Sequence, residues 1–133
     1  MIEYSVYTDG AYSSLRNQGG IGIIFLKNNK LVAKCSKAFK NTTNNRMELL
    51  AVIIALESIH CLDKITIYSD SMYVIECATG KWSKSKNKDL WDRYDKVIQK
   101  LNCKIDFVHI RGHQDNEYNN LCDELAVFAS NLI

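Results

Sequence analysis

The run Leu49–Leu56 constrains the fold more than any other segment, because every residue in it is apolar and Glu57 ends it. At about 1.5 Å per residue the run makes a short helix, and a surface helix of that length would carry a polar face. Thr42–Asn45, just upstream, offers several residues suited to cap a helix. We therefore expect a central helix that is buried on nearly every side.

Strand patterns precede this helix. Ile2–Val6 alternates between apolar and polar residues, and further runs follow at Ile21–Leu26 and Leu31–Phe39. Lys27–Lys30 suits a tight hairpin turn, because its two Asn residues tolerate a positive φ. We expect an antiparallel meander in which the first strand ends at Thr8–Gly10 and a polar loop leads to the second.

Helices and strands alternate after the buried helix. A strand is expected at Ile65–Tyr68, a helix at Ser71–Ala78, a helical stripe from Leu90 to Leu101 and a last strand at Ile105–Ile110. A closing helix is marked by Leu121, Cys122, Leu125, Phe128, Ala129 and Leu132. Since no linker or repeat is visible, we predict one α/β domain with a mixed sheet over residues 1–133.

Composition excludes several classes of protein. The 133 residues are 47% hydrophobic, so a core can form, and no apolar run is long enough to span a bilayer. No signal peptide is visible at the N-terminus, so we expect a cytoplasmic protein. The cysteines are odd in number and scattered without a CxxC pair, which favours reduced, mostly buried thiols over a zinc site: Cys35, Cys61, Cys77, Cys103 and Cys122.

Four acids stand at informative places. Asp9 ends the first expected strand, Asp70 ends the fourth, Glu48 opens the buried helix and Asp123 lies early in the last helix. Ligands of open α/β sheets bind beyond the carboxyl ends of strands. Clustered carboxylates repel one another unless cations lie between them, and Mg²⁺ prefers such oxygens. The pattern indicates metal-dependent phosphoryl transfer.

Each acid also has a structural explanation. Asp9 suits a turn before a glycine, Asp70-Ser71 suits a helix N-cap, and Glu48 suits the positive end of a helix dipole. Asp123 alone would be an ordinary solvated helix residue. From the residues alone, both explanations stay open.

The motifs that carry these acids resemble those of cellular type 1 ribonuclease H. In chain order they are Thr8–Gly10, Thr42–Leu49, Ser69–Val74, Arg111–His113 and Cys122–Ala126, and the likeness runs from Thr8 to the last helix. The resemblance implies a five-stranded mixed sheet, three antiparallel strands followed by two parallel ones, flanked by helices. It further implies endonucleolytic hydrolysis of the RNA strand of RNA–DNA hybrids, leaving 5′-phosphate and 3′-hydroxyl ends.

The resemblance assigns roles residue by residue. Asp9, Glu48, Asp70 and Asp123 match the family's metal-binding carboxylates, which hold two Mg²⁺ ions or, as we expect, Mn²⁺. His113 matches a loop histidine that assists turnover.

The family's substrate contacts match further positions. Asn44 and Asn45 match residues that line the minor groove of the hybrid, where only RNA displays a 2′-hydroxyl. Thr43 lies where the family grips a DNA-strand phosphate, and Gly10 is expected at the substrate surface. The asparagines and Thr43 are equally good helix caps.

The basic segment Lys81–Lys88 resembles a shortened form of the family's basic protrusion. Its side chains suit phosphate contacts, chiefly Lys81, Trp82, Lys84 and Lys86, although such charge runs are commonly solvated loops. Because the segment is short, we expect weak, salt-sensitive binding of the hybrid.

The sequence departs from the family at Ser13–Gly20, Met72, Asp115 and Asn120, none of which is a predicted metal ligand. Three other proteins would share parts of this pattern: a resolvase or transposase core of the wider superfamily, a non-catalytic hybrid-binding module, and the ribonuclease H domain of a reverse transcriptase. The long Thr42–Leu49 motif, the intact acids and the initial Met1 favour a free-standing ribonuclease H. Without any sign of an oligomer in the sequence, we expect a monomer that needs no obligate protein partner.

Overall fold

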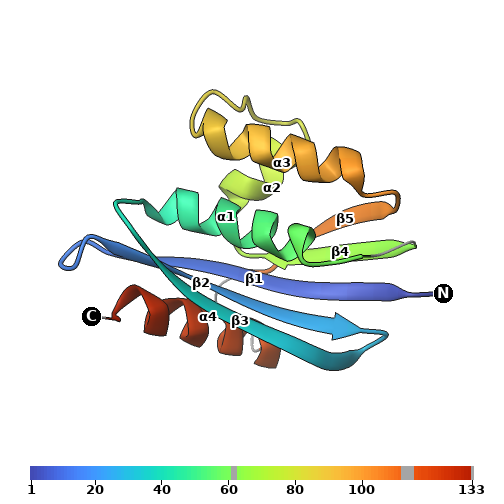
Figure 1. Cartoon of the computed structure of the whole chain (residues 1–133), viewed down its shortest axis with the longest axis horizontal. Helices are drawn as coiled ribbons and strands as arrows, with labels where there is room; N and C mark the ends of the chain where they lie inside the picture. Colours follow the sequence, from blue (N-terminus) through green and yellow to red (C-terminus); the bar gives the residue numbers. More distant parts are fainter. Residues whose placement is uncertain (61–62, 112–115, 133) are drawn as a thin grey trace.

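The computed structural model describes residues 1–60, 63–111 and 116–132. Its elements follow the predicted order (Figure 1). They are β1 (Glu3–Ser13), β2 (Gln18–Lys27), β3 (Lys30–Lys40), α1 (Asn44–Glu57), β4 (Lys64–Ser69), α2 (Met72–Ala78), α3 (Lys88–Lys100), β5 (Lys104–His109) and α4 (Glu117–Ser130).

The five strands form one mixed sheet in the order β3-β2-β1-β4-β5. β2 pairs antiparallel with β1 and with β3, whereas β4 pairs parallel with β1 and with β5. The predicted sheet, three antiparallel strands followed by two parallel ones, is therefore confirmed. β1 lies at the centre, between an antiparallel and a parallel neighbour.

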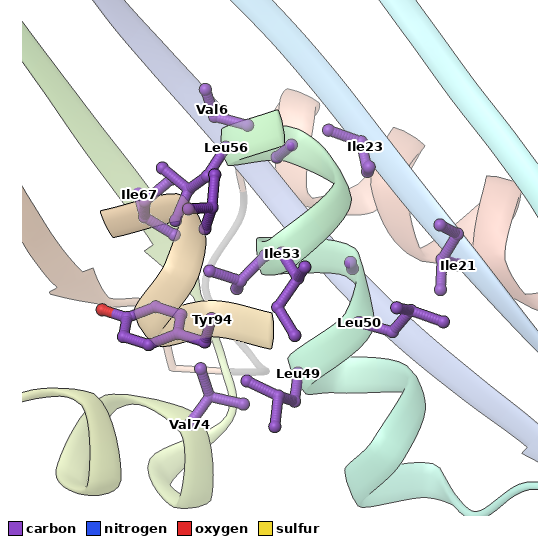
Figure 2. Close-up of a cluster of buried hydrophobic side chains, with 14 of the residues drawn as sticks. Val6, Ile21, Ile23, Leu49, Leu50, Ile53, Leu56, Ile67, Val74 and Tyr94 are labelled. Atoms are coloured by element: carbon purple, nitrogen blue, oxygen red, sulfur yellow. The ribbon is translucent and has the colours of Figure 1, made fainter. Parts of the chain in front are cut away.

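Helices cover both faces of the sheet, with α1, α2 and α3 on one side and α4 on the other (Figure 1). α1 is the predicted central helix, and its Leu49, Val52 and Ile53 are fully buried. Figure 2 shows α1 packed between the sheet and the residues Val74 and Tyr94 of α2 and α3. Each such side chain contributes roughly 1.5–3 kcal/mol by leaving water.

α1 begins earlier than its apolar run. The helix starts at Asn44, and the Thr43 hydroxyl caps it by accepting the Arg46 N–H at 3.2 Å. Glu48 therefore lies in the second turn rather than at the opening of the helix. Because the first turn holds no acid, the helix-dipole explanation of Glu48 is wrong.

β1 runs further than predicted, because it pairs with β2 as far as Ser13 and Gln18. The predicted end at Thr8–Gly10 is wrong for the strand as a whole, and the predicted loop is shorter than expected, a turn over residues 14–17. The parallel pairing with β4 does stop just before Asp9, at Tyr7 and Tyr68. Asp9 thus lies in the part of β1 that extends beyond its parallel neighbour β4. Asp9 itself is part of a strand and not of a turn.

α4 lies on the backbone of β2. A Cβ atom at Gly20 would lie 2.2 Å from the Ala126 carbonyl oxygen, and one at Gly22 would lie 2.1 Å from that of Cys122. Glycine is required here for the close approach. The helix consequently buries small residues, while Phe128, part of the pattern that predicted this helix, is 63% exposed.

The described cysteines are reduced rather than joined in disulfides, as predicted. Cys77 and Cys122 are buried, whereas Cys35 and Cys103 are half-buried, and Cys61 lies outside the described residues. Within those residues, no helix combines the length and apolar character needed to cross a membrane.

Candidate active site

Asp9, Glu48 and Asp70 converge from three different elements. Asp9 comes from β1, Glu48 from α1 and Asp70 from the residue after β4, and one oxygen of each lies within 4.8 Å of the others. Asp9 and Glu48 are only 4% and 7% exposed. Three carboxylates at this spacing in a buried position require either protons or cations among them.

Gly10 joins two of these acids. Its N–H donates to Asp9 Oδ1 at 2.9 Å and to Glu48 Oε1 at 2.5 Å. A Cβ atom at Gly10 would lie 2.4 Å from the backbone nitrogen of Glu48, so the backbones of β1 and α1 touch there. The glycine sets the distance between the two carboxylates.

Asp70 does not cap the helix that follows it, and one of its two carboxylate oxygens is unpaired. Ser71 provides the N-cap of α2 by accepting the Val74 N–H at 3.2 Å, so the helix-cap explanation of Asp70 is wrong. Asp70 Oδ1 is shielded from solvent without a hydrogen-bond partner. Buried carboxylate oxygens are costly when unpaired, and a cation between the acids would satisfy this one.

The pKa of Asp9 is raised to about 8, mainly by burial and then by the charge of Asp70. Burial also raises the pKa of Glu48 well above its ordinary value, with further increases from Asp9 and Asp70. Such shifts are concentrated at functional sites. The donor set, carboxylate oxygens without a thiolate, fits Mg²⁺ or Mn²⁺.

Asp123 lies on α4, exposed, at the border of this cluster. It is outside the group of three acids within 4.8 Å, yet its carboxyl group contributes to the raised pKa of Asp9. Asp123 therefore faces the same site from the other side of the sheet. His113 lies outside the described residues.

The predicted substrate residues Thr43, Asn44 and Asn45 line a pocket of about 400 Å³ together with Lys86 and Asn87. We call it the Asn87 pocket. The sequence assigned no role to Asn87, although its place directly before α3 was a visible signal of a special position. The pocket brings together the start of α1 and the end of the basic segment.

The other residues of the basic segment differ in their surroundings. Trp82 is 51% exposed, and Lys81 Nζ lies 4.0 Å from Glu76. Lys84 folds back onto α3, where its Nζ lies 5.0 Å from the centre of the Trp91 ring and 3.6 Å from Asp95.

A larger groove of about 720 Å³ lies at the far end of α1, between Leu56, Ile59 and Val97. At about 1.5 Å per residue it stands more than two helical turns from Glu48. We place the active site at the acids, because chemistry needs their carboxylates rather than the greater volume.

The family model for RNase H matches residues 2–131. The chain belongs to the ribonuclease H family. The ribonuclease H of Clostridium botulinum is 42% identical over 142 aligned residues, which cover 95% of this chain and 94% of that relative. The resemblance to type 1 ribonuclease H is thereby confirmed, and the chain is a ribonuclease H enzyme.

Solved ribonuclease H structures share the fold. The N-terminal RNase H domain of a Mycobacterium tuberculosis protein superposes with a TM-score of 0.85 at 18% identity, covering 98% of this chain and 95% of that one. LC11-RNase H1, solved in complex with an RNA/DNA hybrid, gives 0.83 at 22% identity, covering 96% of both chains.

Proposed function

We propose that this ribonuclease H hydrolyses the RNA strand of RNA–DNA hybrids with two divalent cations, Mg²⁺ or Mn²⁺, leaving 5′-phosphate and 3′-hydroxyl ends. The observation that carries the proposal is the meeting of Asp9, Glu48 and Asp70, with one carboxylate oxygen of each within 4.8 Å of the others. Asp70 Oδ1 is in addition shielded from solvent without a hydrogen-bond partner. The hybrid bound to the structural neighbour LC11-RNase H1 supports the substrate.

Asp9, Glu48, Asp70 and Asp123 would hold the cations. When bound, such cations would activate a water molecule and stabilise the charge on the attacking and leaving oxygens of the phosphodiester. The Gly10 N–H fixes one oxygen of Glu48, which leaves its other oxygen to meet the 2′-hydroxyl of the RNA. The carboxylates must first lose the protons that their raised pKa values retain. We assign to His113 the assistance of turnover.

The protein distinguishes a hybrid from other duplexes by contacting both strands. Asn44 and Asn45, exposed at the start of α1, would read the minor groove, where the RNA strand displays its 2′-hydroxyls. The Asn87 pocket beside them would take a phosphate of the DNA strand, through Thr43, Lys86 and Asn87. Gly10 borders the RNA strand next to Asp9. Lys81 and Trp82 extend the contact along the backbone.

Cleavage of end-labelled duplexes tests this function. The wild-type protein with Mg²⁺ should cut the RNA strand of a hybrid and leave RNA–RNA and DNA–DNA duplexes intact. Asp70→Asn should abolish cutting, whereas Asp92→Asn, an exposed carboxylate on α3, should not. Hybrid binding without cutting under Mg²⁺ or Mn²⁺ would instead favour a binding module, and cutting of DNA junctions would favour a resolvase-like enzyme.

We also propose that residues 1–133 act as one domain, as a monomer in the cytoplasm without an obligate protein partner. The free thiols of Cys77 and Cys122 support a reducing compartment. Size-exclusion chromatography with light scattering would measure the oligomeric state.

A further inference from the structure

Asn87 occupies an unusual position for its residue type. It is the residue before α3, where an asparagine normally caps the helix with its side chain, yet Asn87 makes no such bond. Its backbone is left-handed, with φ 58° and ψ 39°. An asparagine tolerates this conformation better than most residues, but it is still a costly one. Something other than helix capping holds Asn87 in place.

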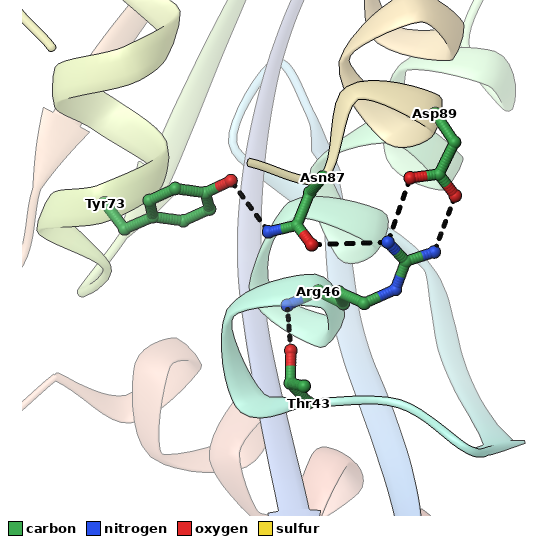
Figure 3. Close-up of polar contacts among 5 residues, drawn as sticks. All are labelled: Thr43, Arg46, Tyr73, Asn87 and Asp89. Carbon is green, nitrogen blue, oxygen red and sulfur yellow. Dashed lines mark hydrogen bonds and ion pairs between the residues drawn. The ribbon is translucent and has the colours of Figure 1, made fainter. Parts of the chain in front are cut away.

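Two side chains from other helices hold it (Figure 3). Asn87 Nδ2 donates to the Tyr73 hydroxyl of α2 at 2.9 Å, and Arg46 Nη1 of α1 donates to Asn87 Oδ1 at 3.3 Å. The amide is thus fixed at both ends, and neither its oxygen nor its nitrogen is used for the helix that follows.

Both holding residues are themselves anchored. Arg46 forms a two-bond fork with Asp89, with N–O distances of 2.7 and 3.0 Å. The Tyr73 hydroxyl also accepts the Trp91 Nε1–H at 3.0 Å, and Trp91 is 2% exposed. The network therefore connects the buried core to the pocket wall and presents Asn87 in one orientation.

The amide nitrogen of Asn87 carries two hydrogens, of which Tyr73 accepts one. We propose that Arg46 and Tyr73 are positioning residues that preorganise Asn87, so that its second N–H is ready for a DNA-strand phosphate in the Asn87 pocket. The inference rests on the proposed function and assigns these two residues to hybrid binding rather than to chemistry. Preorganisation of this kind increases affinity by reducing the ordering that binding requires.

A double-mutant cycle between Tyr73→Phe and Asn87→Ala tests the proposal. Tyr73→Phe keeps the ring that packs at 6.1 Å against Trp91 and removes the acceptor. We expect KM for the hybrid to rise about three- to tenfold with kcat unchanged, the size of one hydrogen bond. In the Asn87→Ala background, Tyr73→Phe should have no further effect on KM.

Tyr94→Phe is the matched control, because Tyr94 also packs against Trp91, at 5.1 Å, whereas the Asn87 amide donates to the hydroxyl of Tyr73. Its KM should equal that of the wild type. An unchanged KM in Tyr73→Phe, or an undiminished effect in the Asn87→Ala background, would overturn the inference. If Tyr73→Phe fails to fold, the same double-mutant cycle is measured between Arg46→Lys and Asn87→Ala, because Arg46 holds the other end of the Asn87 amide.

The reaction of the wild-type enzyme distinguishes a failure of the proposed function from a failure of the role assigned to Arg46 and Tyr73. If the wild-type enzyme leaves the hybrid uncut, the proposed function fails. If it cuts the hybrid and the cycle shows no coupling, only the role of Arg46 and Tyr73 fails.

Discussion

The backbone of Gly10 meets the backbone of Glu48 so closely that no side chain fits between them, and its N–H donates to the Glu48 carboxylate. The distance between two predicted metal ligands, Asp9 and Glu48, is therefore fixed by the absence of a Cβ atom. This contact makes the sheet–helix junction part of the candidate active site.

Gly10→Ala should lower both stability and metal affinity. The added methyl group would force β1 and α1 apart, at a cost of about 1–3 kcal/mol in the free energy of unfolding. Urea unfolding and calorimetric titration with Mg²⁺ measure the two effects. Gly80→Ala is the control, since Gly80 has a φ of 85° and open space around it: it should destabilise by about 1 kcal/mol with unchanged Mg²⁺ affinity. Equal Mg²⁺ affinities in both variants would contradict the role of Gly10.

Asp70→Asn should stabilise the metal-free protein while it abolishes cleavage. The substitution removes a charge that raises the pKa values of Asp9 and Glu48. The gain should be on the order of 1 kcal/mol at pH 8, the size of one pKa unit. Thermal melting in a chelator measures it, with Asp92→Asn as the exposed counterpart. A destabilised Asp70→Asn variant would show that repulsion among the acids is minor.

The metal-free protein should lose stability as the pH rises from about 4 to about 8. The pKa of Asp9 is about 8 in the folded protein against an ordinary value of 3.8. Between these values the folded chain keeps a proton that the unfolded chain loses, so stability is greatest below the lower pKa and is lost through the upper one. The raised pKa of Glu48 acts in the same direction.

Mg²⁺ should offset this loss, because cations and protons compete for the same oxygens. The increase in melting temperature on adding Mg²⁺ should therefore be larger at pH 8.5 than at pH 6. A melting temperature in chelator that rises between pH 5 and 8 would contradict the assignment.

Lys86 and Lys84 should behave differently when replaced by alanine. Lys86 lines the Asn87 pocket, so Lys86→Ala should reduce the slope of log K for hybrid binding against log salt by roughly 1. Lys84 instead lies over the rings of Trp91 and Tyr94, and Lys84→Ala should lower stability by about 0.5–1 kcal/mol with the slope unchanged. Fluorescence anisotropy at several salt concentrations separates them, and identical slopes would refute the distinction.

The spacing of apolar residues and the turn-forming residues predicted the order of the elements and the buried helix, because both features depend on residues close in the sequence. The same rules took Gly10, Gly19 and Gly20 as signs of a turn or loop. In the structure all three stand in strands, where a neighbouring helix or side chain approaches closely. A glycine needed for backbone conformation and one needed for close contact look alike in a sequence.

The candidate site was also predictable only in part, because local motifs are visible in a sequence and contacts between distant residues are not. Motif order supplied Asp9, Glu48 and Asp70, and the structure brings these three together. Asn87 was missed, because its significance comes from Arg46 and Tyr73, which are distant in the sequence. The exposure of Phe128 could not be predicted either, because close contact with the glycines of β2 determines which face of α4 is buried.

The packing of α4 against Gly20 and Gly22 has a consequence for the order of events during protein synthesis. Asp9, Glu48 and Asp70 are all translated before Asp123, and the surface of β2 that receives α4 is already made when α4 emerges. A nascent chain thus holds three of the four proposed metal ligands while Asp123, the fourth, is still in the ribosome. Under the proposed function, docking of α4 would complete the ligand set, so an unfinished chain would carry only three of the four proposed metal ligands past an RNA–DNA hybrid.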